Sequence, residues 1–117
     1  MPLPGGGCYH YDGNEYWYLH DRLHREDGPA ITIPDGFKAW YLNGERHRED
    51  GPAVIHANGV KGWWLNGKRH REDGPAIIYS DGHESWWLNG LELTENEHWA
   101  INFKKQIDEA SSLEESK

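Results

Sequence analysis

The sequence His-Arg-Glu-Asp-Gly-Pro-Ala occurs three times without change, at residues 24–30, 47–53 and 70–76, so that one copy begins every 23 residues. The same interval relates three other series: Trp17, Trp40, Trp63, Trp86; Leu19, Leu42, Leu65, Leu88; and Gly13, Gly36, Gly59, Gly82. A fixed period of this length is typical of stacked repeat proteins. The sequence therefore predicts an array over residues 5–93, with residues 1–4 as a short lead-in.

One unit, residues 36–59, shows how the chain is expected to fold. Residues 37–42 are aromatic and apolar, have the length of a strand, and end at Asn43-Gly44, a strong signal for a tight turn. Residues 53–56 form a second expected strand, and the polar residues 45–49 an ordered connection between the two. Two strands in each of four units predict an all-β, antiparallel meander of about eight hairpin strands.

The first copy of the unit is divergent. Residues 5–13 stand at the 23-residue interval from residues 28–36, although Gly5-Gly6-Gly7 replaces Gly-Pro-Ala. We interpret residues 5–13 as part of a degenerate first unit and not as a linker. The array is therefore expected to begin almost at the start of the sequence.

Aromatic residues are expected on both faces of the sheet. Alternation along a strand puts Trp40 and Leu42 on one face and Ala39 and Tyr41 on the other. Neither face is then simply exposed to solvent, because both carry rings. We expect one face to be covered by the polar connections or by the C-terminal segment, and the other to form a groove.

The repeat ends after Gly90. Thr94-Glu95-Asn96-Glu97 has the pattern of a capping box at the start of a helix. The apolar residues that follow lie at the spacing of one helical face: Trp99, Phe103, Ile107, Ala110 and Leu113. The sequence predicts an amphipathic helix at residues 94–113, whose apolar face covers the open edge of the last unit, and a tail at residues 114–117.

The charge balance disfavours several partners. Twenty acidic residues against twelve lysines and arginines give a net charge of −8, so a nucleic acid or an anionic membrane surface is not expected to bind. We expect neither a signal peptide nor a transmembrane segment, because no apolar run is long enough to span a bilayer. The single cysteine, Cys8, cannot form an internal disulfide, and we expect a cytoplasmic location.

The unit resembles a MORN (membrane occupation and recognition nexus) repeat. Gly62, Trp64 and Gly67 match its first glycine, its tryptophan and its second glycine, and the equivalent residues in the other units are Tyr18, Tyr41 and Trp87. The unit departs from the family pattern at Val60, where the family has an aromatic residue. The resemblance covers residues 5–93 and implies an elongated stack of hairpins that acts as a scaffold or binding surface, without catalytic residues.

The amino-acid sequence of the repeated heptapeptide is also similar to sequences in small repeat proteins of phages and large viruses. Bacterial proteins with MORN-like repeats are often described as antitoxin-like. This second resemblance implies a small inhibitor that occludes a host protein.

Repeated His, Arg, Glu and Asp residues do not predict an active site. Equivalent residues of successive units are expected about 10 Å apart, because one strand lies between them. His24, His47 and His70 are then too far apart to share a zinc ion, whose ligands lie about 2 Å from the metal. We expect no enzyme activity, no metal and no cofactor. The aspartates are expected to bond the backbone of their turns, and the arginines and glutamates to pair across units.

The repeated aromatic residues and arginines are instead the predicted binding surface, since these residue types anchor many protein interfaces. The candidate binding residues are Tyr18, Tyr41, Trp64, Trp87, Arg25, Arg48 and Arg71. We expect a non-enzymatic module that binds another protein. Alternatives are a small-molecule binder that holds a nucleotide or sugar between the rings, and a structural scaffold. The unpaired first strand, near Cys8, leaves a homodimer possible.

Overall fold

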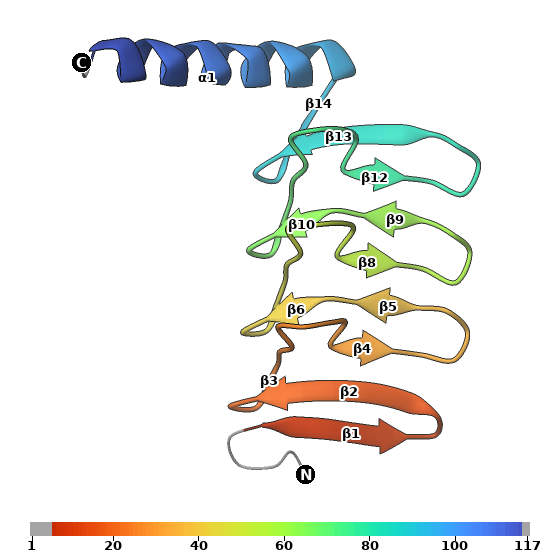
Figure 1. Cartoon of the computed structure of the whole chain (residues 1–117). Helices are drawn as coiled ribbons and strands as arrows, with labels where there is room; N and C mark the ends of the chain where they lie inside the picture. Colours follow the sequence, from red (N-terminus) through yellow and green to blue (C-terminus); the bar gives the residue numbers. More distant parts are fainter. Residues whose placement is uncertain (1–5, 116–117) are drawn as a thin grey trace.

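A computed structural model describes residues 6–115 of the chain, with side chains described as far as residue 110. The predicted lead-in, Gly5 and residues 116–117 lie outside the described residues. Figure 1 shows a mostly β chain with a single helix at its C-terminal end. The described strands are β1 (Gly7–Tyr11), β2 (Asn14–Leu19), β3 (Arg22–Leu23), β4 (Ile31–Thr32), β5 (Lys38–Ala39), β6 (Tyr41–Leu42), β7 (Glu45–Arg46), β8 (Val54–Ile55), β9 (Lys61–Gly62), β10 (Trp64–Leu65), β11 (Lys68–Arg69), β12 (Ile77–Ile78), β13 (Glu84–Leu88) and β14 (Leu91–Leu93).

The strands form an open antiparallel meander. Its main sheet has the order β1-β2-β4-β5-β8-β9-β12-β13-β14, with β3 paired to β2. The pairs β6–β7 and β10–β11 are separate two-stranded hairpins, which lie beside the main sheet (Figure 1). The antiparallel meander is confirmed, but the expected number of strands is wrong, because fourteen strand segments lie within the described residues.

Two of the additional strands arise because the long strands of the two middle units are interrupted at Trp40 and Trp63, whereas β2 and β13 run unbroken through Trp17 and Trp86. The other four, β3, β7, β11 and β14, are short return strands after the tight turns. The Trp40 N–H donates to the Ala53 carbonyl at 2.7 Å, whereas the Trp40 carbonyl accepts from the His47 N–H at 3.0 Å. Trp40 thus bonds to the main sheet on one side and to the connection on the other. Part of that connection, Glu45–Arg46, is the return strand β7. The polar residues were therefore correctly placed outside the core but wrongly read as a strand-free connection.

The tight turns have the backbone expected from Asn-Gly. Asn43, Asn66 and Asn89 have φ values of 50–51°, in the left-handed region that asparagine and glycine tolerate. In the first unit His20 and Asp21 occupy the turn and also have positive φ values, 50° and 62°. The turn geometry is therefore kept even where the preferred residues are absent.

Successive units are joined by hydrogen bonds between each repeated loop and the next tight turn. The Asn66 N–H donates to Nδ1 of His47 at 3.0 Å, and the Arg48 N–H donates to the Trp64 carbonyl at 3.0 Å. Both contacts recur one unit earlier and one unit later. Asn43 and Asn89 donate to Nδ1 of His24 and His70, and the Arg25 and Arg71 N–H groups donate to the carbonyls of Tyr41 and Trp87. Each loop thus fixes the turn that follows it in the array.

The buried core is thin. The buried apolar residues are small or β-branched: Ala30, Ala39, Ala53, Val54, Ala76 and Ile77. The repeated tryptophans are only partly buried, on both faces of the sheet. This agrees with the expectation that neither face is simply solvent-exposed, and it means that the rings cover the core and do not form it.

Helix α1 (Glu95–Glu115) begins with the predicted capping box. The Thr94 N–H donates to the Glu97 carboxylate at 2.9 Å, and the Glu97 N–H donates to the Thr94 hydroxyl at 3.1 Å. The helix extends to Glu115, two residues beyond the predicted end. By our criterion of length and apolarity, no helix among the described residues is able to cross a membrane.

The predicted packing face of α1 is wrong except at Trp99, whose ring lies 5.5 Å from the Trp86 ring of the array. The helix meets the array through His98 and Asn102, which are 0 % and 8 % exposed, while Trp99, Phe103 and Ile107 are 42 %, 66 % and 50 % exposed. The physical reason is that the last loop presents free carbonyl groups, which require hydrogen-bond donors. The Leu113 side chain, also predicted for the apolar face, lies outside the described side chains.

Candidate functional site

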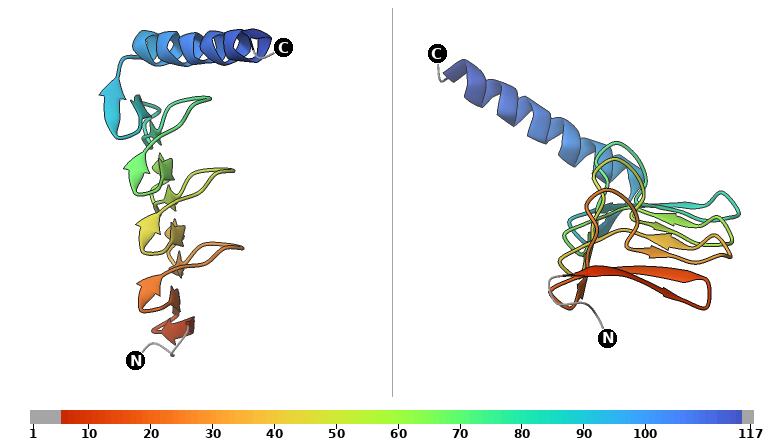
Figure 2. Two further views of the ribbon diagram at one scale, coloured as in Figure 1. Left: turned by 90° about the vertical axis from the view of Figure 1, so that its left-hand side faces the viewer. Right: turned by 60° about the horizontal axis from the view of Figure 1, so that its bottom comes forward.

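The three repeated loops, residues 24–30, 47–53 and 70–76, project from one side of the array. The left view of Figure 2 shows the three loops one above the other, projecting in the same direction. We call them loops 1, 2 and 3. Because their sequences are identical, they carry the same side chains at equivalent places.

Each loop is held together by its arginine. In loop 2, the Arg48 guanidinium lies 3.9 Å from the centre of the Trp40 ring. Its Nε donates to Asp50 at 3.0 Å, and its Nη1 donates to the Pro52 carbonyl at 3.0 Å. A guanidinium that stacks on an aromatic ring and uses its donors in this way is fixed in one orientation. Arg71 in loop 3 makes the equivalent contacts.

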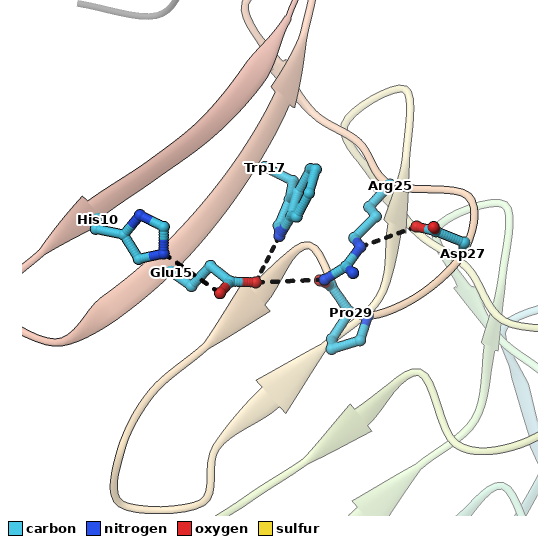
Figure 3. Close-up of polar contacts among 6 residues, drawn as sticks. All are labelled: His10, Glu15, Trp17, Arg25, Asp27 and Pro29. Atoms are coloured by element: carbon cyan, nitrogen blue, oxygen red, sulfur yellow. Dashed lines mark hydrogen bonds and ion pairs between the residues drawn. The ribbon is translucent and has the colours of Figure 1, made fainter.

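Loop 1 differs in having an additional ion pair. Figure 3 shows Arg25 beside Trp17, with its guanidinium group bonded to Asp27 and Pro29 on one side and to Glu15 on the other. The Arg25–Glu15 distance is 3.3 Å, and Glu15 also accepts from the Trp17 indole at 2.7 Å. The indole hydrogen bond and then Arg25 hold the pKa of Glu15 below its usual value. Glu15 is therefore a carboxylate at neutral pH.

These contacts extend one expectation and correct another. The aspartates of the loops bind the arginine side chain of their own loop, at 2.9–3.0 Å, and Asp50 also makes the expected hydrogen bond to the backbone of its turn. Among the described residues, the loop glutamates pair with no arginine of a neighbouring unit. Glu26 and Glu49 lie 3.6 and 3.7 Å from the histidine of their own loop, and Glu72 binds Lys105 of helix α1 at 2.9 Å.

Clefts lie between the projecting loops. Cleft A, between loops 1 and 2, has a volume of about 660 Å³ and is lined by Arg25–Gly28, Trp40, Leu42 and residues 47–50. Cleft B, between loops 2 and 3, has a volume of about 520 Å³ and is lined by the equivalent residues 48–51, Trp63, Leu65 and residues 70–73. Each cleft thus combines a tryptophan and a leucine with charged residues from two loops.

The ends of the loop series have related clefts. Beneath loop 1, a cleft of about 510 Å³ is lined by Trp17, Tyr18, Leu19 and residues 24–27. Above loop 3, cleft C, of about 480 Å³, lies between Glu72, Asp73 and helix α1, with Trp99 and Lys105 among its lining residues. The helix therefore stands in the place that a further loop would occupy.

Carboxylates dominate the accessible charge of clefts A and B. The Glu26, Asp27, Glu49 and Asp50 side chains are 83–87 % exposed, whereas Arg25 and Arg48 are only 23–24 % exposed. The hydrogen bond and charge of Arg48 lower the pKa of Asp50. A partner entering the clefts therefore meets ionised carboxylates before it meets the arginines.

The predicted binding residues fall on two separate surfaces. Arg25, Arg48 and Arg71 line the clefts, and Tyr18 lines the cleft beneath loop 1. Tyr41, Trp64 and Trp87 belong to another surface, together with two arginines that the sequence analysis did not single out. The predicted set is therefore not brought together into one site.

That second surface is a ladder of alternating rings and guanidinium groups. Arg46 donates to the Tyr41 hydroxyl at 3.2 Å and lies 5.2 Å from the Trp64 ring centre. Arg69 lies 5.2 Å from the Trp64 ring and 5.0 Å from the Trp87 ring. The rings of the ladder are thus packed by neighbouring units, which favours a structural role for them.

Two further groups of residues were not predicted from the sequence as candidate sites. The loop glutamates and aspartates were assigned to turn and pairing roles, although their exposure makes them the most accessible charges of the clefts. Cys8, His10 and Glu15 form the group that the described residues offer for a metal ion, with ligand atoms within 4.8 Å of one another. The 23-residue spacing singled out the loop acidic residues, and their exposure was the missing information. Cys8, His10 and Glu15 do not recur at that spacing, so the repeat gave no signal for them.

Comparisons with protein-family models, with curated proteins and with solved structures gave no match.

Proposed function

We propose that the protein is a non-enzymatic binding module that holds a basic segment of another protein along its acidic loops. We further propose that four copies of the 23-residue unit form a MORN-like stack, which sets the loops at regular intervals. The recurrence of the His47–Asn66 and Arg48–Trp40 contacts one unit earlier and one unit later supports this second proposal.

The composition of clefts A and B supports the proposal above all. In cleft B, Trp63 and Leu65 provide an apolar surface, and Glu49, Asp50 and Glu72 provide carboxylates around it. A lysine or arginine side chain has the matching chemistry, with an aliphatic stem and a positive head. Cleft A repeats the arrangement.

The spacing of the clefts adds a requirement on the partner. Units that contribute two strands each to the main sheet repeat about every 10 Å. An extended polyproline II segment advances about 3.1 Å per residue and has three residues per turn, so every third side chain points the same way about 9 Å further on. A segment with a basic residue at every third position therefore fits successive clefts.

The loop chemistry supports binding over catalysis. Nδ1 of each loop histidine accepts a backbone N–H of the next unit, and each loop arginine is engaged by an aspartate and a carbonyl. These groups are occupied in holding the loops. A phage-encoded or antitoxin-like inhibitor that occludes a host protein would be one form of such a module. That this chain is such an inhibitor stays a prediction.

The test uses two labelled peptides of equal charge. One carries four lysines separated by two prolines, the other four lysines separated by three. We expect the first to bind more tightly in a fluorescence anisotropy titration at physiological salt, because its lysines lie on one side at the interval of the clefts. Equal affinities for the two peptides would argue against the proposal.

The variants test the location of the peptide. Glu26→Gln/Glu49→Gln removes two cleft carboxylates, and Glu84→Gln/Glu92→Gln removes two exposed carboxylates that line none of the clefts described above. We expect the first variant to weaken binding about tenfold, at roughly 0.7 kcal/mol for each exposed charge pair, and the second to change it less than twofold. Equal losses would show that binding follows net charge alone.

A further inference from the structure

The first hairpin carries a cluster of side chains that the clefts do not use. Cys8 and His10 are two residues apart on β1, so both point to the same face of the sheet. Glu15 on β2 lies directly opposite His10 in the register, on that face. The ligand atoms of the three residues lie within 4.8 Å of one another.

Within the part of the chain that the structure describes, no other hairpin combines these residue types. By cross-strand register, the counterparts of His10 are Thr32, Ile55 and Ile78, and those of Glu15 are Lys38, Lys61 and Glu84. The counterparts of Cys8, by hydrogen bonding to the next strand, are Ala30, Ala53 and Ala76. At these three positions the other hairpins have alanine, an aliphatic residue or threonine, and lysine or glutamate. The first hairpin has Cys8, His10 and Glu15 there, and all three side chains can ligate a metal.

The register also explains why the sequence did not reveal the cluster. The turn between β1 and β2 has two residues, Asp12 and Gly13, whereas the next hairpin closes with a bond from the Ile33 N–H to the Phe37 carbonyl around three residues. The first hairpin is therefore one residue shorter. The 23-residue interval aligns Cys8 with Ile31, but its structural counterpart is Ala30.

The carboxylate of Glu15 is already oriented. Its Oε1 accepts from the Trp17 indole at 2.7 Å and from Arg25 at 3.3 Å, while Oε2 lies 3.5 Å from Nε2 of His10 (Figure 3). Hydrogen bonds to the outer oxygen of a ligating carboxylate are typical of metal sites, where they fix the ligand. The Arg25 charge is shared with Asp27, at 3.0 Å, which reduces its repulsion of a cation.

We propose that Cys8, His10 and Glu15 bind a zinc ion or a similar borderline divalent cation, with water in the fourth position. Thiolate, imidazole and carboxylate are all zinc ligands, with bonds of about 2.0–2.3 Å that put the ligand atoms of a tetrahedral site about 3.5 Å apart. His10, whose side chain is 71 % exposed, has the freedom to close the remaining distance. The ion clips β1 to β2 at the end of the array opposite helix α1.

The experiment is a titration of the full chain with Co²⁺, followed by displacement with Zn²⁺. Cys8 is the single cysteine of the sequence, so a thiolate-to-cobalt charge-transfer band reports on this site alone. We expect one Co²⁺ per chain, with this band, and its loss when Zn²⁺ is added. Binding of Co²⁺ without the band would overturn the proposal.

The variants separate this site from the other histidines. Cys8→Ser is expected to abolish the band, and His10→Ala to weaken Zn²⁺ binding at least about tenfold. His83→Ala is the matched control, because His83 is also an exposed imidazole, 2.7 Å from the carboxylate of Asp81, but has no thiol partner. It should leave both readouts unchanged. Unaltered Zn²⁺ affinity in both Cys8→Ser and His10→Ala would also refute the site.

Discussion

Loops 1 and 2 have the same sequence as loop 3 but face a different neighbour. Loops 1 and 2 are each followed along the array by another loop across an open cleft, whereas loop 3, which faces loop 2 on one side, is followed by helix α1 on the other. As a result Gly74 and Pro75 are buried, while the equivalent Gly51 and Pro52 are only partly buried. The loop sequence therefore specifies a conformation, and the element packed on the loop decides which of its groups remain accessible.

The contacts at loop 3 show how the helix replaces a loop. His98 donates from Nε2 to the Arg71 carbonyl at 2.5 Å, and Asn102 donates to the Glu72 carbonyl at 2.6 Å. Trp86 has no loop arginine, because Thr94 stands at that position of the repeat. The His98 and Trp99 rings pack against Trp86 instead, at 5.0 and 5.5 Å.

Removing His98 should have the largest effect on this difference. His98→Ala leaves the Arg71 carbonyl unpaired and a cavity beside Trp86, so we expect the free energy of unfolding to fall by about 2–4 kcal/mol. Phe103→Ser, on the exposed face of the same helix, should change it by less than about 0.5 kcal/mol. Urea denaturation measures both. A larger loss for Phe103→Ser would restore the apolar face as the packing face.

A smaller effect is expected from the pH dependence of loop 3. Burial lowers the pKa of His70, against an opposing contribution from Glu72, and the charge of Lys105 and the neighbouring His98 add to the lowering. The unfolded chain therefore takes up a proton before the folded protein does. His70 therefore contributes to the free energy of unfolding above about pH 6.5, and this contribution is lost as the pH falls through the folded-state pKa of His70.

His70→Asn tests this contribution, because its amide oxygen retains an acceptor for the Asn89 N–H but does not titrate. We expect the decrease in melting temperature from about pH 7 to pH 5 to be smaller in His70→Asn than in the unsubstituted chain. His83→Asn, in an exposed hairpin turn, is the control and should retain the decrease. An unchanged slope in His70→Asn would mean that other groups cause it.

The smallest effect is expected at the surface of loop 3. Lys105 and Glu72 form an ion pair at 2.9 Å, with side chains 58 % and 53 % exposed. Lys105→Met should lower the melting temperature slightly at low salt and not at about 1 M salt, where exposed charges are screened. A loss that persists at high salt would indicate that Lys105 packs against loop 3 and does not act through its charge.

Local signals in the sequence predicted much of this fold. The positive φ values of Asn43 and Asn66, the meander and the capping box at Thr94 depend on neighbouring residues, so the sequence was sufficient for them. The interruption at Trp40 was not predictable in the same way, because it depends on bonds to Ala53 and His47, which the fold places on two different sides of Trp40.

The candidate sites were less predictable for a related reason. Stacking of Arg48 on Trp40 depends on how the loop folds back over its own unit, and once formed it leaves the acidic residues as the accessible groups. Amphipathic spacing located the helix but not its contact face, because the carbonyls of Arg71 and Glu72 are a feature of the folded loop.

The proposed binding role depends on where a basic segment lies, and the indole N–H resonances of the tryptophans report this directly. Trp40 and Trp63 line clefts A and B, whereas Trp64 and Trp87 lie in the ladder of rings and guanidinium groups. In a ¹⁵N-edited NMR titration with the peptide of four lysines separated by two prolines, we expect the Trp40 and Trp63 indole signals to shift and those of Trp64 and Trp87 to stay in place. Shifts confined to Trp64 and Trp87 would contradict the account.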